Sequence, residues 1–237
     1  SWLPLASTSG ESCNAGETLC AICNAAEIDG GPWQNFDTAG DPEQLSGRFV
    51  SSFAEGPVGE VWVGTYGGGL SRVDTTTGDT TRYRHRPADA DSLSDDRVMA
   101  VYADSDNRIW VGTRNGGLGR LDPTTGRFTH FRHDPQHPDS LSSTSVTSIL
   151  CDDNGALWIG TYGDGLNRFD PASGKFRVYR HDPADARTLS SDRILDLYRD
   201  RAGVLWVGTE DGGLNRFNAA DGSFSHYRHD ADDATSL

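Results

Sequence analysis

The feature that most constrains the fold of this chain is a repeat of 48 residues. The stretch GEVWVGTYGGGLSR, at 59–72, returns as NRIWVGTRNGGLGR, GALWIGTYGDGLNR and GVLWVGTEDGGLNR. The same interval separates the tryptophans, Trp62, Trp110, Trp158 and Trp206, and the leucines after them, Leu70, Leu118, Leu166 and Leu214. Four copies without an insertion indicate that one structural unit recurs along the chain.

Each copy predicts four short β-strands and no helix. In the second copy, RVMAVYAD alternates, which predicts a strand with Val98, Ala100 and Tyr102 on one face and Met99 and Val101 on the other. RIWVGTR is an apolar run rich in β-branched and aromatic residues, and GLGRLD and RFTHFRH predict the third and fourth strands. A four-stranded unit of this length in tandem is typical of a β-propeller blade. The predicted fold class is therefore all-β, a β-propeller with four blades in this chain.

These motifs resemble those of a known family. DDNGALWIGTYGDGLNRFD, with the HDP and SLS that follow, resembles the two-component regulator propeller repeat, over residues 45–237. In that family the propellers usually form the extracytoplasmic sensors of hybrid histidine kinases or precede a diguanylate cyclase, and polysaccharide fragments are the most frequent ligands. The resemblance implies a bacterial signalling receptor, a periplasmic or extracellular location and a seven-bladed ring.

The four repeats occupy residues 46–237 of a propeller region at 32–237, which follows an N-terminal cysteine-containing segment at 1–31. Residues 32–36 repeat the spacing of aromatic residues in the fourth strand of the last three copies, which predicts an isolated outer strand there. Because the last repeat has its own fourth strand and the sequence stops within a connection, we expect further blades after Leu237. Two alternatives stay open: a closed four-bladed ring, and two chains that complete one ring as a homo-oligomer.

Charge and hydropathy exclude several function classes. The chain has 21 Lys and Arg against 35 Asp and Glu, a formal net charge of −14. This balance argues against nucleic-acid binding, which requires basic clusters that displace counterions. The sequence has no apolar run long enough to span a bilayer and no signal-peptide pattern. We therefore expect contact with a membrane only through a segment outside this chain.

The glycine-rich stretch after each tryptophan strand could be taken for a phosphate loop. A phosphate-binding loop leads into a helix and, in a P-loop, contains a lysine. Here the loop leads into another strand, contains no lysine and occurs four times. Glycine adopts positive φ in tight strand connections at little cost, so we interpret these loops as structural turns.

The tips of these loops differ between copies, and we expect them to specialise in binding. They should lie together around the axial mouth of the propeller, where aromatic, arginine and carboxylate side chains suit an oligosaccharide or another small ligand. A solvated rim without a ligand is the alternative. The candidate binding residues are Tyr66, Arg114, Asn115, Tyr162, Asp164, Glu210 and Asp211.

The histidines and cysteines favour structural roles. The histidines recur once per blade, at His85, His133, His181 and His229, which predicts a repeated structural hydrogen bond. Cys151 falls in an innermost-strand pattern and is expected to be a buried apolar residue. The remaining cysteines are Cys13, Cys20 and Cys23. We expect two of them to form one disulfide, which would imply an oxidising compartment. No metal site and no cofactor are predicted.

The sequence also lacks a nucleophile elbow, a catalytic dyad and a cofactor fingerprint. We therefore expect a sensor domain that binds a ligand without catalysis and has no catalytic residues of its own. The alternatives are a secreted propeller enzyme that acts on polysaccharide, such as a lyase, and a protein-interaction scaffold.

Overall fold

The structure, a computed structural model, describes residues 47, 49–233 and 236, all within one compact unit, Asp37–Leu237. The cysteine-containing segment, with Cys13, Cys20 and Cys23, and the expected strand at 32–36 lie outside the described residues. The described residues form β-strands, turns and bends, and they contain no helix with the length and apolar character of a membrane span. The all-β prediction is confirmed.

The described residues contain sixteen strands, which form four sheets of four strands each. The first sheet contains β1 (Val50–Glu55), β2 (Glu60–Thr65), β3 (Gly69–Asp74) and β4 (Thr80–Tyr83). The second contains β5 (Val98–Ala103), β6 (Ile109–Thr113), β7 (Leu118–Asp122) and β8 (Arg127–Phe131). The third contains β9 (Val146–Cys151), β10 (Leu157–Thr161), β11 (Leu166–Asp170) and β12 (Lys175–Tyr179). The fourth contains β13 (Ile194–Arg199), β14 (Leu205–Thr209), β15 (Leu214–Asn218) and β16 (Ser223–Tyr227).

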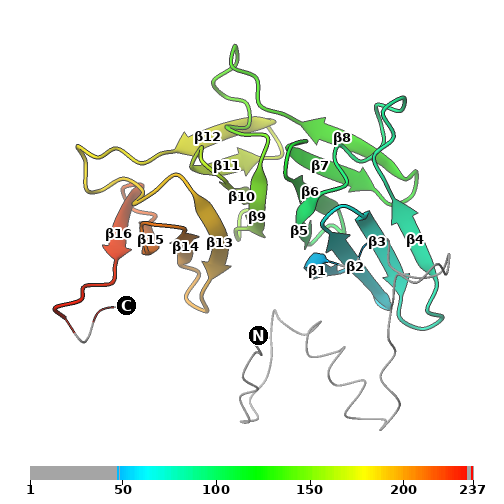
Figure 1. The fold of residues 1–237 in the computed structure, drawn as a ribbon, viewed down its shortest axis with the longest axis horizontal. Helices are drawn as coiled ribbons and strands as arrows, with labels where there is room; N and C mark the ends of the chain where they lie inside the picture. Colours follow the sequence, from blue (N-terminus) through cyan, green and yellow to red (C-terminus); the bar gives the residue numbers. More distant parts are fainter. Residues whose placement is uncertain (1–46, 48, 234–235, 237) are drawn as a thin grey trace, which may run out of the picture. The chain divides into compact units, whose positions relative to one another are not determined.

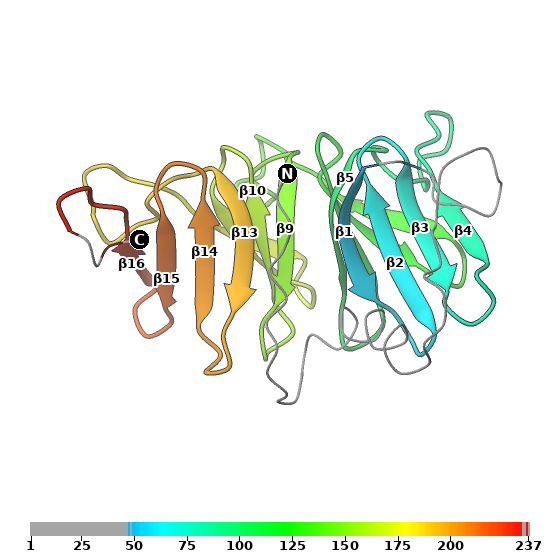
Figure 2. The same cartoon turned by 60° about the horizontal axis from the view of Figure 1, so that its bottom comes forward.

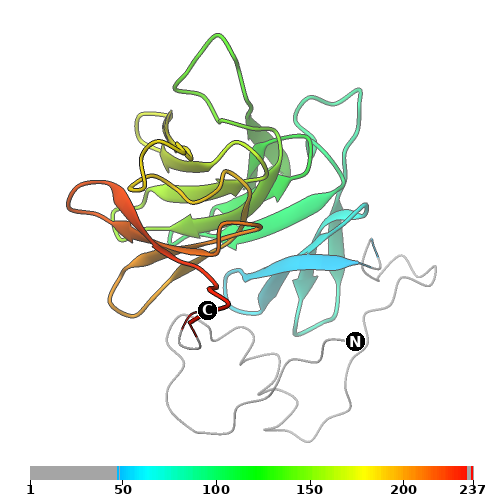
Figure 3. The same cartoon turned by 60° about the vertical axis from the view of Figure 1, so that its left-hand side comes forward.

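Each sheet is an antiparallel meander in sequence order, which is the topology of a propeller blade. The blades follow one another along an arc, with β1, β5, β9 and β13 on its inner side (Figure 1). In Figure 2 the connecting loops lie above and below the strands, and Figure 3 shows the sheets from a further side. The loops between second and third strands all lie at one end of the blades, because every pairing is antiparallel.

Apolar side chains fill each interface between neighbouring blades. The three interface clusters contain Trp62, Trp110 and Trp158, one from each preceding blade, together with aliphatic residues of the following blade. The corresponding face of the fourth blade is more exposed: Tyr198 is 63% and Tyr227 44% exposed. No other described strand covers this face. A seven-bladed ring stays a prediction.

The alternation expected for the innermost strands is interrupted by a bulge. In β5 the pairing shifts between Val98, opposite Thr113, and Ala100, opposite Gly112. Val98 therefore packs in the cluster between the first and second blades, whereas Ala100 and Tyr102 contribute to the next cluster. The expectation that Val98 shares a face with these two residues is wrong, because the extra residue of a bulge reverses the alternation. The same shift occurs in β1, β9 and β13.

A hydrogen bond to an aspartate fixes the tryptophan of two blades. The indole Nε1 of Trp110 donates to Oδ2 of Asp104 at 2.8 Å, and Trp206 makes the same bond to Asp200. In the first blade Gly56 replaces the aspartate, and the buried Nε1 of Trp62 has no partner within the described residues. The first copy of the repeat thus lacks one element of the common framework.

Three of the four repeated histidines make the structural hydrogen bond that the sequence predicts. The Nδ1 atoms of His85, His133 and His181 lie 2.7, 2.9 and 2.6 Å from backbone carbonyl oxygens eight residues later. Each bond closes the connection to the following blade, so these imidazoles belong to the framework. Cys151 is half-buried at the end of β9, and burial raises the pKa of its thiol.

Candidate ligand-binding site

The glycine-rich loops are structural turns, as the sequence indicates. The Thr113 hydroxyl donates to the Gly117 carbonyl at 3.1 Å, and the corresponding threonine closes the loop in every blade. Gly117 has φ of 78°, and a side chain on it would overlap the Phe131 carbonyl oxygen at 2.6 Å. Glycine is therefore required here for both conformation and space.

Backbone hydrogen bonds hold each loop tip beside the innermost strands. The amide of Arg114 donates to the Arg97 carbonyl at 2.9 Å, just before the innermost strand of its own blade. Tyr162 and Glu210 make the equivalent bonds to Ser145 and Arg193. The tips are thus fixed around the end of the inner strands, while their side chains are free to vary.

Arg114 and Tyr162 line a cavity at the inner side of the arc, which we call the axial cavity. The cavity has a volume of about 740 Å³ and is bordered by residues of all four innermost strands, among them Ser52, Met99, Thr147 and Asp196. The bulge residues Met99 and Thr147 both lie on its wall. This volume lies within the range of small-ligand sites. The bulges, which the sequence did not reveal, therefore help to shape the cavity.

Arg114 is an uncompensated cation at the mouth of this cavity. Its side chain is exposed, and within the described residues its guanidinium has no ion pair and no side-chain hydrogen bond. Arg97 and Arg193, at the entry of two inner strands, are by contrast paired with carboxylates. In an acidic chain, this makes Arg114 the mouth residue best able to receive a negatively charged or strongly polar group.

Tyr162 belongs to a polar network between the third and fourth blades. Its hydroxyl donates to the Glu210 carboxylate, at 2.9 Å from each oxygen, and this bond raises the pKa of Tyr162. Arg193 Nη1 lies 3.2 Å from Glu210 and 3.5 Å from Asp211. The structure thus joins three of the predicted residues, Tyr162, Glu210 and Asp211, through an arginine that the prediction omitted.

Tyr66 and Asn115 lie around a second network, between the first and second blades. Tyr66 packs edge-on against Phe49, with ring centroids 6.2 Å apart, and forms a backbone bridge with Arg97. The backbone N–H of Asn115 donates to Oδ2 of Asp95 at 3.0 Å, and Asp95 also pairs with Arg97 at 3.1 Å. Asp95 raises the pKa of Arg97.

Asp164 is the predicted site residue with the least support. Its side chain is half-buried and makes no ion pair and no hydrogen bond within the described residues. It is absent from the cavity wall. The residues that sequence reasoning missed, Arg97 and Arg193, occupy a position that reads Phe, Arg, Ser and Arg in the four copies. This variation before each innermost strand is the signal that could have identified them.

Family comparison agrees with the repeat pattern. Segments 92–115, 140–163 and 188–211 match the model of the two component regulator propeller family. Each segment runs from the connection before an innermost strand to the variable loop tip. The chain therefore carries two-component regulator propeller repeats. The comparison with curated proteins gave no match.

Solved structures show the same fold. The extracellular domain of a protein described as the hybrid two component system BT3049 from B. thetaiotaomicron is 25% identical, with a TM-score of 0.70 over 81% of this chain and 26% of that one. The extracellular domain of the one component system BT4673 from the same organism is 26% identical, with a TM-score of 0.66 over 83% and 24%. This chain thus spans about a quarter of either domain. Virginiamycin B lyase from Staphylococcus aureus shares the fold, at 21% identity and a TM-score of 0.58 over 80% and 58%.

Proposed function

We propose that this chain is part of the ligand-sensing extracytoplasmic propeller of a bacterial signal-transduction receptor. It binds its ligand at the mouth of the axial cavity and catalyses no reaction. The observation that carries the proposal is the uncompensated guanidinium of Arg114 at a cavity of about 740 Å³. The extracellular domains to which the chain is similar support a periplasmic or extracellular location.

The mouth offers the groups that recognise an oligosaccharide or a similarly polar small ligand. Arg114 would form charge-assisted hydrogen bonds with a carboxylate or hydroxyl groups of the ligand. The rings of Tyr66 and Tyr162, which are 41% and 42% exposed, offer apolar faces on which a sugar ring could stack. The networks through Arg97 and Arg193 would hold these rings in place, so the site is largely preformed.

Binding at this mouth would transmit a signal through the packing of the blades. The site combines loop tips with innermost strands, and neighbouring innermost strands pack on one another. A ligand that prefers one arrangement of the blades shifts the population toward that arrangement. Blades beyond the fourth, or a second chain, would pack on the exposed face around Tyr198 and Tyr227, and we propose a seven-bladed ring for the intact protein.

Several features support binding rather than catalysis. The histidines that recur, His85, His133 and His181, are used in backbone hydrogen bonds away from the cavity wall. The carboxylates at the mouth, Glu210 and Asp211, are paired with Arg193. The described groups at the mouth therefore fit recognition and positioning.

A thermal-shift screen of neutral and acidic oligosaccharides tests this function. A ligand of the mouth should raise the melting temperature of the wild-type protein and have a much smaller effect on Arg114→Ala. The matched control is Arg132→Ala, which removes an exposed arginine from a different part of the second blade. If no glycan raises the melting temperature, or if Arg114→Ala responds like wild type, binding at the mouth is contradicted.

A further inference from the structure

A second hollow lies between the third and fourth blades, at the opposite end of the strands from the mouth loops. Its volume is about 860 Å³, larger than that of the axial cavity. Its walls come from the first-to-second-strand turns of both blades and from the turn between β15 and β16. We call this hollow the arginine groove, after the four arginines on its wall: Arg168, Arg177, Arg199 and Arg216.

Arg177 reaches across the arginine groove from the outer strand of the third blade. Its guanidinium carbon lies 4.9 Å from the ring centroid of Tyr179, so the aromatic face holds the group in position. A side chain on Gly222, in the fourth blade, would come 3.7 Å from its Nη2. Within the described residues Arg177 has no carboxylate partner. Its guanidinium is therefore held in place and keeps its hydrogen-bond donors for a ligand.

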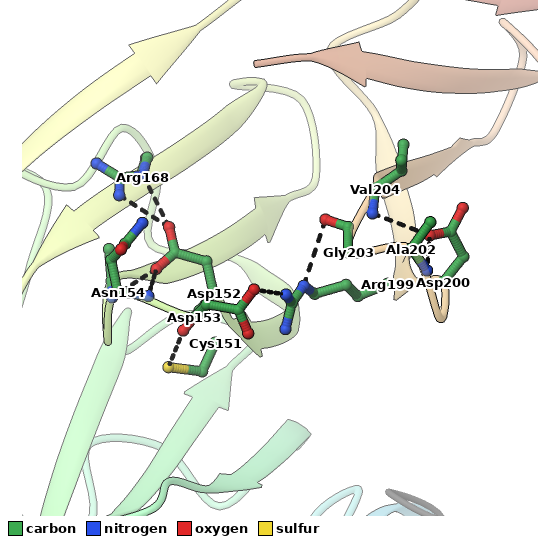
Figure 4. Close-up of polar contacts among 11 residues, drawn as sticks. Cys151, Asp152, Asp153, Asn154, Arg168, Arg199, Asp200, Ala202, Gly203 and Val204 are labelled. Atoms are coloured by element: carbon green, nitrogen blue, oxygen red, sulfur yellow. Dashed lines mark hydrogen bonds and ion pairs between the residues drawn. The ribbon is translucent and has the colours of Figure 1, made fainter. Parts of the chain in front are cut away.

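Arg199 crosses the groove in the opposite direction. From the end of β13 it pairs with Asp153 of the third blade, and its Nε donates to the Gly203 carbonyl at 3.4 Å (Figure 4). Arg168 lies on the other wall, where its Nε and Nη2 both donate to Oδ2 of Asp152, at 3.2 and 2.8 Å. Two paired arginines thus border the space into which Arg177 projects.

Several charged residues of the groove differ from the residues at the equivalent positions of the other copies. Arg177 stands where the first two copies have Thr81 and Thr129, and Arg199 where the second and third have Ala103 and Cys151. One carboxylate of the repeat is replaced by an amide, because Asn218 stands where the other three copies have the aspartates at 74, 122 and 170. A framework position needs no such changes, because the equivalent interfaces fold without them.

The remaining carboxylates of the groove are already paired. Asp152 pairs with Arg168, Asp153 with Arg199, and Asp221 with Arg187 at 3.0 Å. Arg216 donates to the neutral amide of Asn218 at 2.9 Å. Positive charge therefore exceeds negative charge locally, in a chain with a formal net charge of −14.

We propose that the arginine groove is a second binding site, for a ligand that carries carboxylate, sulfate or phosphate groups. Arg177 supplies the free guanidinium, which can bind an oxyanion with two parallel hydrogen bonds. Arg168 and Arg199 are held by ion pairs to Asp152 and Asp153 in the turn of the third blade, and Arg199 also by the Gly203 carbonyl in the turn of the fourth. They therefore set the width of the site. Because both blades contribute, an occupied groove would also stabilise their interface.

Titration of the full chain, followed by calorimetry and by amide NMR, tests this site. The probes are citrate, inorganic sulfate and inorganic phosphate, with maltotriose as the neutral comparison. We expect at least one oxyanion to bind saturably, to shift the amides of Asn154, Gly203 and Gly222, and to bind more weakly as salt rises. The probe that binds best distinguishes a carboxylate ligand from a sulfate or phosphate ligand.

Matched variants assign the binding. Arg177→Thr introduces the residue of the equivalent strands, so the fold should be kept, and the affinity should fall about tenfold or more through loss of a charge-assisted bond. Arg86→Thr, an equal change of charge in the first blade, and Arg114→Ala, at the mouth, should leave the affinity read from the amides of Asn154, Gly203 and Gly222 unchanged. This readout separates the groove from the mouth, which can itself bind an anion. Absence of binding by all three oxyanions, or an equal loss in Arg86→Thr, would overturn the proposal.

Discussion

Gly112 of the second blade packs directly against Val146 of the third. A side chain on Gly112 would lie 2.5 Å from Cγ1 of Val146, well inside van der Waals contact. Gly64 and Gly160 meet Val98 and Ile194 in the same way. In the first three blades, the glycine two residues after the tryptophan thus allows the next blade to approach closely, which explains why it recurs.

This contact predicts different costs for the same substitution in different blades. Gly112→Ala should lower the free energy of unfolding by about 1–3 kcal/mol, the usual cost of overpacking. Gly208→Ala is the matched control: its nearest neighbour is the Asp196 carbonyl oxygen at 3.7 Å, so it should cost much less. Urea denaturation of both variants measures the difference. Equal destabilisation would show that blade packing is not the reason for this glycine.

Asp104 predicts a second stability effect. Its carboxylate accepts bonds from the Trp110 indole at 2.8 Å and from Nε of Arg108 at 2.6 Å. Asp104→Ala would leave the buried indole N–H without a partner, which costs about 1–3 kcal/mol. Asp106→Ala is the control, because the Asp106 side chain is 68% exposed and also pairs with Arg108. Similar denaturation midpoints for the two variants would contradict this role.

The same carboxylate predicts how stability depends on pH. Burial disfavours the charged form of Asp104, but the bonds from Trp110 and Arg108 outweigh burial and lower its pKa. Its contribution is therefore complete above the unfolded value of about 3.9 and is lost as pH falls through the lower folded pKa. The difference in stability between wild type and Asp104→Asn should shrink from pH 7 to pH 3. A difference that stays constant over this range would exclude the mechanism.

Much of the fold follows from the sequence because the same blade, with the same packing between neighbours, occurs four times. The interval between Trp62 and Trp110 predicts the blade, and the positions of His85 and His133 predict its connecting hydrogen bonds. The bulge at Met99 could not be predicted, because one extra residue in a mostly apolar strand does not change its sequence pattern recognisably. The pairing of Tyr162 with Glu210 depends on how neighbouring blades dock, and strand periodicity carries no information on that.

The Tyr162 network predicts an effect on binding without an effect on folding. Because Tyr162 and Glu210 are exposed, Tyr162→Phe should leave the denaturation midpoint close to that of wild type. The phenyl ring would lose its hydrogen bond to Glu210 and its fixed orientation, so a ligand that stacks on it should dissociate faster. Surface plasmon resonance with a ligand from the glycan screen measures this rate. An unchanged dissociation rate would place Tyr162 outside the binding site.

Isothermal titration calorimetry of that same ligand with wild type, Arg114→Ala and Arg114→Lys tests binding at the axial mouth most directly. We predict that Arg114→Ala weakens binding by about tenfold or more, since a charge-assisted hydrogen bond is lost, and that Arg114→Lys recovers part of the loss. Equal affinities for all three proteins would show that the ligand does not bind through Arg114 at the axial mouth.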